Sequence, residues 1–137
     1  MQRYYEVIQE MHDEWEEKFK AFIEGLKRKG MCVILFGSKA KGEDNLLSDF
    51  DMVIIARDKE KEDLALKIDF PADLFCYTPE DCLREIRNKN TILLDAFTLG
   101  KVMLDEIDVF NFLKNEVEKV VERSGLIRCE QGWLVKG

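Results

Sequence analysis

Apolar residues recur every three or four positions along the N-terminal part of the chain, with charged residues between them. This spacing places them on one side of a helix, so it predicts a long amphipathic helix over roughly residues 3–28. Cations follow at residues 27–29, and Gly30 suits a left-handed helix end. We expect the stripe to pack on the protein's own sheet, although its aromatic content leaves a partner surface as the alternative. The stripe consists of Tyr5, Ile8, Met11, Trp15, Phe19, Phe22 and Leu26.

Three short apolar runs downstream predict β-strands. Residues 31–36 form a continuous run rich in branched side chains, which is typical of a strand buried on both faces. Residues 50–56 and 72–77 predict the second and third strands. Between these two strands, residues 59–67 predict a short helix.

Two helices and a short strand are predicted after the third strand. The first helix should begin after Thr78, because Thr at the N-cap, Pro79 at the first helical position and acids in the first turn favour a helix start. A second helix covers residues 91–99 and should end at Gly100. Residues 102–104 predict a short edge strand.

The C-terminal part adds one more helix and a tail. Asp105 should cap this helix, and residues 126–135 show no clear pattern, so Trp133 suits either the core or a contact surface. The chain alternates strands and helices without a Ser/Gly-rich linker, so we predict a single α/β (α+β) domain over residues 1–137, with helices packed on a small mixed sheet. The stripe of the last helix is Phe110, Leu113, Val117 and Val120.

Charge and composition exclude several classes of function. The 137 residues carry a net charge of −7, whereas proteins that bind duplex nucleic acid are normally basic. The chain has no apolar run long enough for a membrane span, and its N-terminus is too polar for a secretory signal, so we expect a cytoplasmic protein without membrane contact. Of the four cysteines, none of them in metal-site spacing, Cys32 and Cys76 should be buried. His12, the single histidine, is expected on the surface, which argues against histidine-based catalysis.

A small, basic, glycine-flanked loop follows the first predicted strand. In residues 37–42 (GSKAKG), glycine lets backbone amides approach an anion, Ser38 adds a hydroxyl, and the lysines add positive charge. The spacing of Gly37 and Gly42 matches a P-loop, but acidic residues 43–44 stand where Lys and Ser or Thr are required. The glycine spacing also differs from the dinucleotide motif. The loop is therefore a candidate phosphate-binding loop of neither kind.

Two aspartates, Asp49 and Asp51, lie one residue apart at the start of the second predicted strand. Residues i and i+2 of a strand share a face, about 7 Å apart at the backbone, so both carboxylates can converge on metal ions while Phe50 points into the core. Mg²⁺ suits such a site because it prefers oxygen ligands and shares its shell with substrate phosphates. A third carboxylate is needed, and Asp73 is the first candidate, with Asp69 as the alternative.

The candidate phosphate loop and the aspartate pair together resemble the signature of the minimal nucleotidyltransferases, which belong to the DNA polymerase β-like superfamily. The resemblance spans roughly residues 31–105, and lysines stand where family members often carry arginine. It rests on Gly37-Ser38-x-Ala40-x-Gly42, a five-residue loop, Ser48-Asp49-x-Asp51, and Asp73-Leu74 on the next strand.

This resemblance implies the nucleotidyltransferase fold and a Mg²⁺-dependent transfer of a nucleoside monophosphate, AMP from ATP being the expected case. A hydroxyl of the acceptor would attack the α-phosphorus and release pyrophosphate. The implied ligands of two Mg²⁺ ions, which also serve as catalytic residues, are Asp49, Asp51 and Asp73. The residues expected to hold the nucleotide are Gly37, Ser38, Lys39, Lys41 and Ser48.

The resemblance also implies a partner. Small chains of this family often act with a separately encoded helical protein, and toxin–antitoxin members modify a tyrosine of a HEPN-type toxin. A protein acceptor is therefore the first expectation and a small-molecule acceptor the second. The alternative function is a catalytically weak, nucleotide-binding, antitoxin-like module that acts by binding a HEPN-type partner. The sequence leaves a homo-oligomer open.

Overall fold

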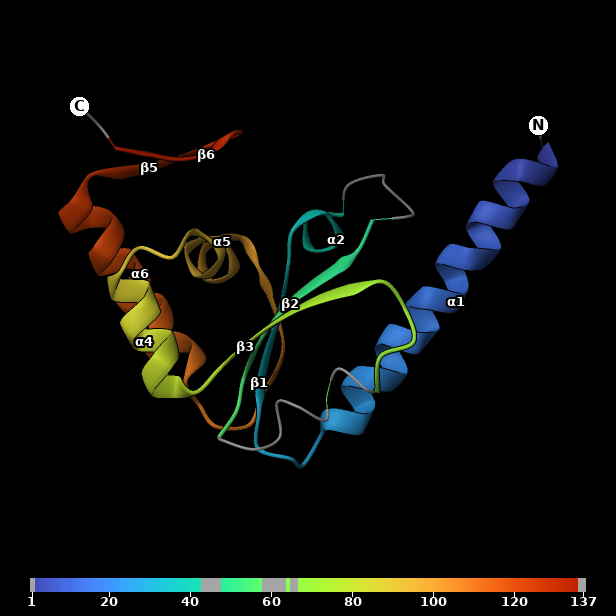
Figure 1. The fold of residues 1–137 in the computed structure, drawn as a ribbon, viewed down its shortest axis with the longest axis horizontal. Coiled ribbons are helices and arrows are strands. Elements are labelled where there is room, and N and C mark those ends of the chain that lie inside the picture. The colour runs from blue at the N-terminus through green and yellow to red at the C-terminus, as the bar shows by residue number, and fades with distance from the viewer. Residues whose placement is uncertain (1, 43–47, 58–63, 65–66, 136–137) are drawn as a thin grey trace.

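The computed structural model describes residues 2–42, 48–57, 64 and 67–135, and Figure 1 shows its fold. Four strands form one mixed sheet in the order β3-β2-β1-β4, and β5 and β6 form a separate hairpin. The predicted helix over residues 59–67 falls mainly outside the described residues. The elements are α1 (Gln2–Leu26), β1 (Cys32–Phe36), α2 (Ser38–Lys41), β2 (Phe50–Ile55), β3 (Ala72–Tyr77), α4 (Pro79–Arg87), α5 (Thr91–Leu99), β4 (Lys101–Asp105), α6 (Phe110–Ser124), β5 (Leu126–Cys129) and β6 (Gly132–Val135).

Helices cover both faces of the sheet, with α1 on one side and α4, α5 and α6 on the other (Figure 1). Successive strand residues point to opposite faces, so each strand contributes to both cores. Val33 of β1 and Met52 of β2 lie in the core under α1, whereas Ile34 and Val53 lie in the core under the other helices. All five residues of β1 are buried, as the continuous apolar run predicted.

Hydrogen bonds confirm the predicted start of α4 and correct that of α6. The Thr78 hydroxyl accepts a hydrogen bond from the backbone N–H of Asp81 at 3.1 Å, and Pro79 opens α4. The Asp105 carboxylate accepts hydrogen bonds from three backbone amides, including that of Phe110 at 3.0 Å. Asp105 is not the N-cap residue itself, because α6 begins at Phe110 with Val109 at the N-cap, but its carboxylate binds the amides of both residues across the turn from β4.

Helix α1 is buried along its second half only. Trp15 is the first of its hydrophobic residues to pack against the core, and Phe19 and Leu26 are buried within it. Tyr5 and Met11, which belong to the same stripe, are exposed. The expectation that the whole stripe packs on the protein's own sheet is therefore wrong for its first half. The ribbon shows the N-terminal half of α1 projecting beyond the sheet (Figure 1).

The turn after α1 is closed by the carboxylate of Glu106, which directly follows β4 in the chain. Arg28 and Gly30 both adopt positive φ angles, of 70° and 73°. Their backbone amides donate to the Glu106 carboxylate at 2.7 and 3.1 Å. These bonds favour the charged carboxylate and lower the pKa of Glu106. The helix ends at Leu26, two residues earlier than predicted.

The C-terminal tail forms an antiparallel hairpin that the sequence pattern did not predict. Its strands are four residues each, with Ile127 paired to Leu134 and Arg128 paired to Trp133. The indole N–H of Trp133 donates to the Asp95 carboxylate at 2.8 Å. Arg128 Nε lies 2.9 Å from the same oxygen, in an ion pair that is not aligned as a hydrogen bond. Trp133 is thus a half-buried anchor that holds the hairpin to α5.

Candidate active site

The candidate metal-binding carboxylates meet at the N-terminal ends of two parallel strands. Strands β2 and β3 pair in parallel, and their register places Asp51 directly beside Asp73. Both residues share a face with the next odd-numbered positions, Val53 and Phe75, on the side of the sheet covered by α4, α5 and α6. Asp49 is exposed and immediately precedes β2. The structure therefore brings together the three carboxylates that the sequence singled out.

The surroundings of Asp51, including the two neighbouring carboxylates, change its pKa. Its pKa is raised to about 6, first by burial, then by the negative charges of Asp73 and Asp49, with a contribution from a hydrogen bond to Asp73. A cation bound between the carboxylates would offset these terms, because it favours the ionised form. Without a cation, the negative charge of Asp73 disfavours the ionised form of Asp51. The pair is therefore electrostatically suited to a bound cation.

The first turn of the candidate phosphate loop lies against Asp51. Gly37 leaves β1 with a φ of 76°, a conformation that side chains rarely adopt. A Cβ atom at this position would lie 2.5 Å from Asp51 Oδ2. The short helix α2 follows, and the chain leaves it through Gly42, whose φ is 68°. The loop and the aspartates thus form one continuous site.

The two lysines of the loop lie differently. Lys39 Nζ stands 4.9 Å from the centroid of the Phe50 ring, a cation–π contact on the α1 side of the sheet. Lys41 is exposed at the end of α2. Ser48 is half-buried next to Asp49. Lys39 therefore packs toward the sheet face opposite Asp51, whereas Lys41 faces solvent.

Asp69, the alternative third carboxylate, lies elsewhere. Lys18 of α1 lies 3.5 Å from Asp69 Oδ2 and donates a hydrogen bond to the backbone oxygen of Asp69 at 3.3 Å. Asp69 therefore belongs to the contact with α1, and Asp73 is the aspartate that joins Asp51. This geometry favours Asp73 over Asp69, in line with the sequence-based order of candidates.

The other polar residues considered from the sequence lie apart from this pair. His12 is on α1, where its ring nitrogens lie near the carboxylates of Asp13 and Glu16. Cys32 is buried in the sheet, and burial raises its pKa to about 12, so it stays protonated and unreactive. Cys76 is half-buried rather than fully buried, because it lies on the edge strand β3.

Aromatic residues next to the carboxylates were not identified from the sequence. Phe36 is the register partner of Asp51 on β1, and Phe75 follows Asp73 by two residues. Their rings are 5.8 Å apart and lie on the same face as the carboxylates. They shield one side of Asp51 from water, which accounts for the burial that raises its pKa. Only the pairing of β1, β2 and β3 brings these positions together.

The carboxylates fit a Mg²⁺ ion that is completed by substrate. Within the described residues, no group of three His, Cys, Asp or Glu side chains is arranged to hold a metal by itself. Mg²⁺ is, however, commonly bound by one or two carboxylates together with substrate phosphates and water. Asp51 and Asp73 provide such a pair, beside a loop suited to phosphates.

A family model matches most of the chain. Residues 13–128 match this model, which is described as nucleotidyltransferase domain. No curated protein gives a significant match. None of the helices in the described ranges is long and apolar enough to cross a membrane.

Three solved structures are similar to the chain. The first is a toxin–antitoxin crystal structure with AMP-PNP, with 21% identity and a TM-score of 0.51 over 80% of this chain and 89% of that chain. The second is a mutant MntA-HpeT toxin–antitoxin, with 18% identity and a TM-score of 0.49 over 80% and 88%. The third is a tri-AMPylated Shewanella oneidensis HEPN toxin in complex with MNT antitoxin, with 16% identity and a TM-score of 0.46 over 83% and 89%. The first of these likenesses supports the same fold.

Proposed function

The chain belongs to the nucleotidyltransferase domain family, and from this premise we propose that it transfers AMP from ATP to a hydroxyl of a partner protein in a Mg²⁺-dependent reaction. The observation that carries the proposal is the pairing of Asp51 with Asp73 on adjacent parallel strands, in contact with Gly37. A triphosphate on the loop would place its phosphates beside both carboxylates. Metal ligands and phosphate donors thus share one short stretch of structure.

Each residue of the candidate site has a proposed role. Asp51 and Asp73, with Asp49, would hold Mg²⁺, which would supply neutralisation of the phosphates and polarisation of the acceptor hydroxyl. The backbone at Gly37 and the Ser38 hydroxyl donate to the β- and γ-phosphates. Lys41 and Ser48 complete the nucleotide contacts, and Lys39 fixes α2 against Phe50.

The reaction itself needs positioning more than a strong base. The acceptor oxygen attacks the α-phosphorus, the bond from that phosphorus to the bridging oxygen breaks, and pyrophosphate leaves. The exposed carboxylate of Asp73 takes the hydroxyl proton. These roles require no histidine, and His12 lies on α1 beside Asp13 and Glu16 rather than beside Asp51 and Asp73.

The proposed acceptor is a HEPN-type helical protein, with a small molecule as the second candidate. The support is the sequence resemblance together with the shared fold of the toxin–antitoxin structure that contains AMP-PNP. The alternative function is a weakly catalytic, nucleotide-binding module that acts by contact with the same kind of partner.

Calorimetry and mass spectrometry together test the proposal. We expect Mg²⁺-dependent binding of a non-hydrolysable ATP analogue that is lost in Asp51→Asn and kept in the matched control Asp69→Asn. A co-expressed HEPN-type partner should gain the mass of AMP on a hydroxyl side chain, and only with the wild-type site. Absence of nucleotide binding at millimolar Mg²⁺ would refute the enzyme proposal. A partner that is bound but never modified would favour the contact module.

A further inference from the structure

The first half of α1 is a helical arm with an uncovered apolar stripe. We call residues 2–14 the N-terminal arm. Tyr4 and Tyr5 are 67% and 66% exposed, and Val7 and Met11 are 47% and 38% exposed. Exposed apolar side chains that gather on one short stretch of helix, rather than being scattered singly, mark an interaction surface. Their exposure is not shared by the continuation of the stripe, where Phe19 and Leu26 are buried.

The spacing of the stripe suits a second helix. Ile8, Met11 and Trp15 of the stripe follow one another at intervals of three and four residues, and Tyr4, which is not part of the stripe, lies four residues before Ile8. This alternation is the seam on which another α-helix packs side by side. The match to the nucleotidyltransferase domain begins only at residue 13, so most of the arm lies ahead of the matched domain.

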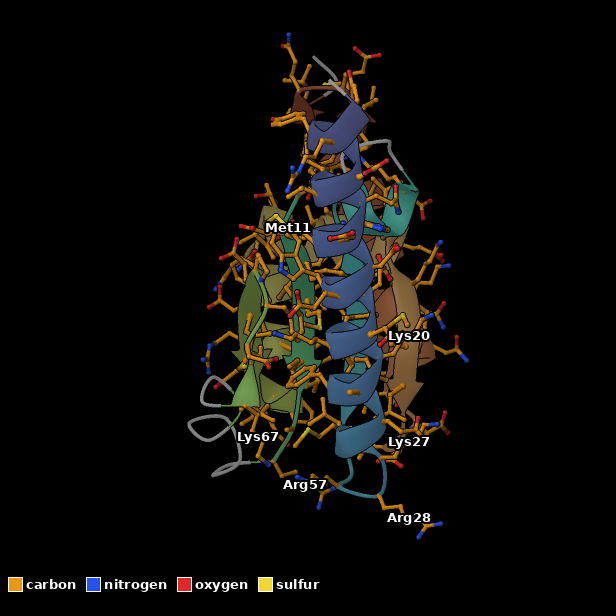
Figure 2. All side chains as sticks on the ribbon, turned by 90° about the vertical axis from the view of Figure 1, so that its right-hand side faces the viewer. Met11, Lys20, Lys27, Arg28, Arg57 and Lys67 are labelled. Atoms are coloured by element: carbon orange, nitrogen blue, oxygen red, sulfur yellow. The ribbon has the colours of Figure 1, made fainter. Side chains whose placement is uncertain are left out.

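The charges of the arm select the kind of helix it takes. The arm itself has four acids and one arginine, and the three residues that follow it bring the total over residues 2–17 to six acids. Cations instead gather at the other end of α1, where Figure 2 shows Lys20, Lys27 and Arg28 below Met11. An acidic arm attracts a helix whose apolar stripe is bordered by Lys and Arg. The six acids are Glu6, Glu10, Asp13, Glu14, Glu16 and Glu17.

The same charges argue against other occupants. In the rest of α1 the stripe is buried, so a second copy of this chain would have to pair arm with arm, bringing acids against acids. An anionic membrane surface would repel the arm for the same reason. A basic amphipathic helix of another protein meets both requirements, the apolar seam and the opposite charge.

The arm also lies at the catalytic end of the molecule. In Figure 1 the N-terminal half of α1 and the helix α2, which follows Gly37, lie at the same upper side. We propose that the N-terminal arm docks the acceptor protein through a basic amphipathic helix, an inference that rests on the proposed transfer to a protein hydroxyl. A partner held there reaches the end of the sheet where Asp51 and Asp73 lie.

Two designed helical peptides test the recognition directly, with no acceptor protein present. Each has about 20 residues and the same leucine seam, one bordered by lysine and the other by glutamate. By fluorescence anisotropy, the lysine peptide should bind the full chain, more weakly at higher salt, and the glutamate peptide should not. Met11→Glu should raise the Kd about tenfold or more, which is typical of losing a central contact. Gln9→Glu adds the same charge on the same helix, and Met11→Leu keeps the seam, so both should stay within about twofold.

Three results would overturn the inference. They are equal binding of the two peptides, unchanged binding by Met11→Glu, or a dimer in light scattering that Met11→Glu dissociates. The last result would assign the arm to a second copy. Transfer to the HEPN-type partner should show a higher KM in Met11→Glu than in Gln9→Glu, with equal calorimetric binding of the ATP analogue. Wild-type chain that binds no nucleotide would refute the proposed function alone, whereas unchanged transfer by Met11→Glu would refute only the docking role.

Discussion

The raised pKa of Asp51 predicts that this carboxylate destabilises the folded protein in the absence of metal. Folding raises the pKa from its ordinary value of 3.8 to about 6. Between these values the folded chain keeps a proton that the unfolded chain has lost, so stability falls as the pH rises through this window and stays lower above it. We therefore expect Asp51→Asn to stabilise the metal-free protein at pH 7.5 and to have little effect near pH 4.

The magnitude follows from the shift and from the solvation of the side chain. Two pKa units correspond to about 3 kcal/mol. Asp51 is only partly buried, and water screens its interactions with the exposed Asp49 and Asp73, so we expect a gain of about 1 kcal/mol. Denaturant unfolding with a metal chelator, at both pH values, measures it.

Binding of Mg²⁺ and an ATP analogue should make the wild type more stable than Asp51→Asn. Mg²⁺ with an ATP analogue at about 100 times its Kd should stabilise the wild type by about 2.7 kcal/mol and leave Asp51→Asn unchanged. Asp69→Asn is the control, because Asp69 pairs with Lys18 and lies apart from the carboxylate pair. The raised pKa of Asp51 would not explain the result if Asp51→Asn were no more stable than wild type at pH 7.5. The same holds if its gain in unfolding free energy were equal at pH 4.

Three further substitutions have definite expected outcomes. Gly37→Ala should cost about 1–3 kcal/mol by unfolding and abolish binding of the ATP analogue in calorimetry, because the residue has a positive φ and its Cβ would meet Asp51. Glu106→Gln should lower the thermal midpoint at neutral pH and flatten its fall with acid, because the lowered pKa of Glu106 gives stability that is lost as the pH drops through that pKa. Trp133→Phe should cost about 1–3 kcal/mol and speed hydrogen exchange in β5 and β6, because the Asp95 carboxylate then loses its indole donor; unchanged exchange would show that this bond does not hold the hairpin.

The sheet and most helix starts could be predicted from the sequence because their signals are local. Thr78 and Pro79 define the start of α4 through a cap and a ring that need only the next few residues. The alternation around Asp51 likewise places its carboxylate opposite the side chain of Phe50. Asp73 was ranked before Asp69 from the sequence, but its place directly beside Asp51 depends on the parallel pairing of β2 with β3, which no local pattern states.

How much of the α1 stripe is buried depends on the lengths of the helix and of the sheet, and the hydrophobic periodicity of the sequence does not give their ratio. Helix α1 has 25 residues and is therefore about 37 Å long. Strand β1 has five residues and spans about 17 Å. A helix twice as long as the sheet it covers must project beyond it, so half of the stripe is left for another surface. The C-terminal hairpin was missed for a related reason, since its anchor joins Trp133 to the distant Asp95.

The spacing between the phosphate loop and the aspartates follows from the pairing of β1 with β2. The antiparallel register places Phe36 opposite Asp51, so the chain that leaves β1 at Gly37 must return beside it. A Cβ at position 37 would meet Asp51 Oδ2, and glycine removes that conflict. The glycine and the aspartate are therefore tied to each other by their close approach. This contact explains why a loop and an Asp-x-Asp pair, each a weak signal alone, become specific when they occur at this spacing.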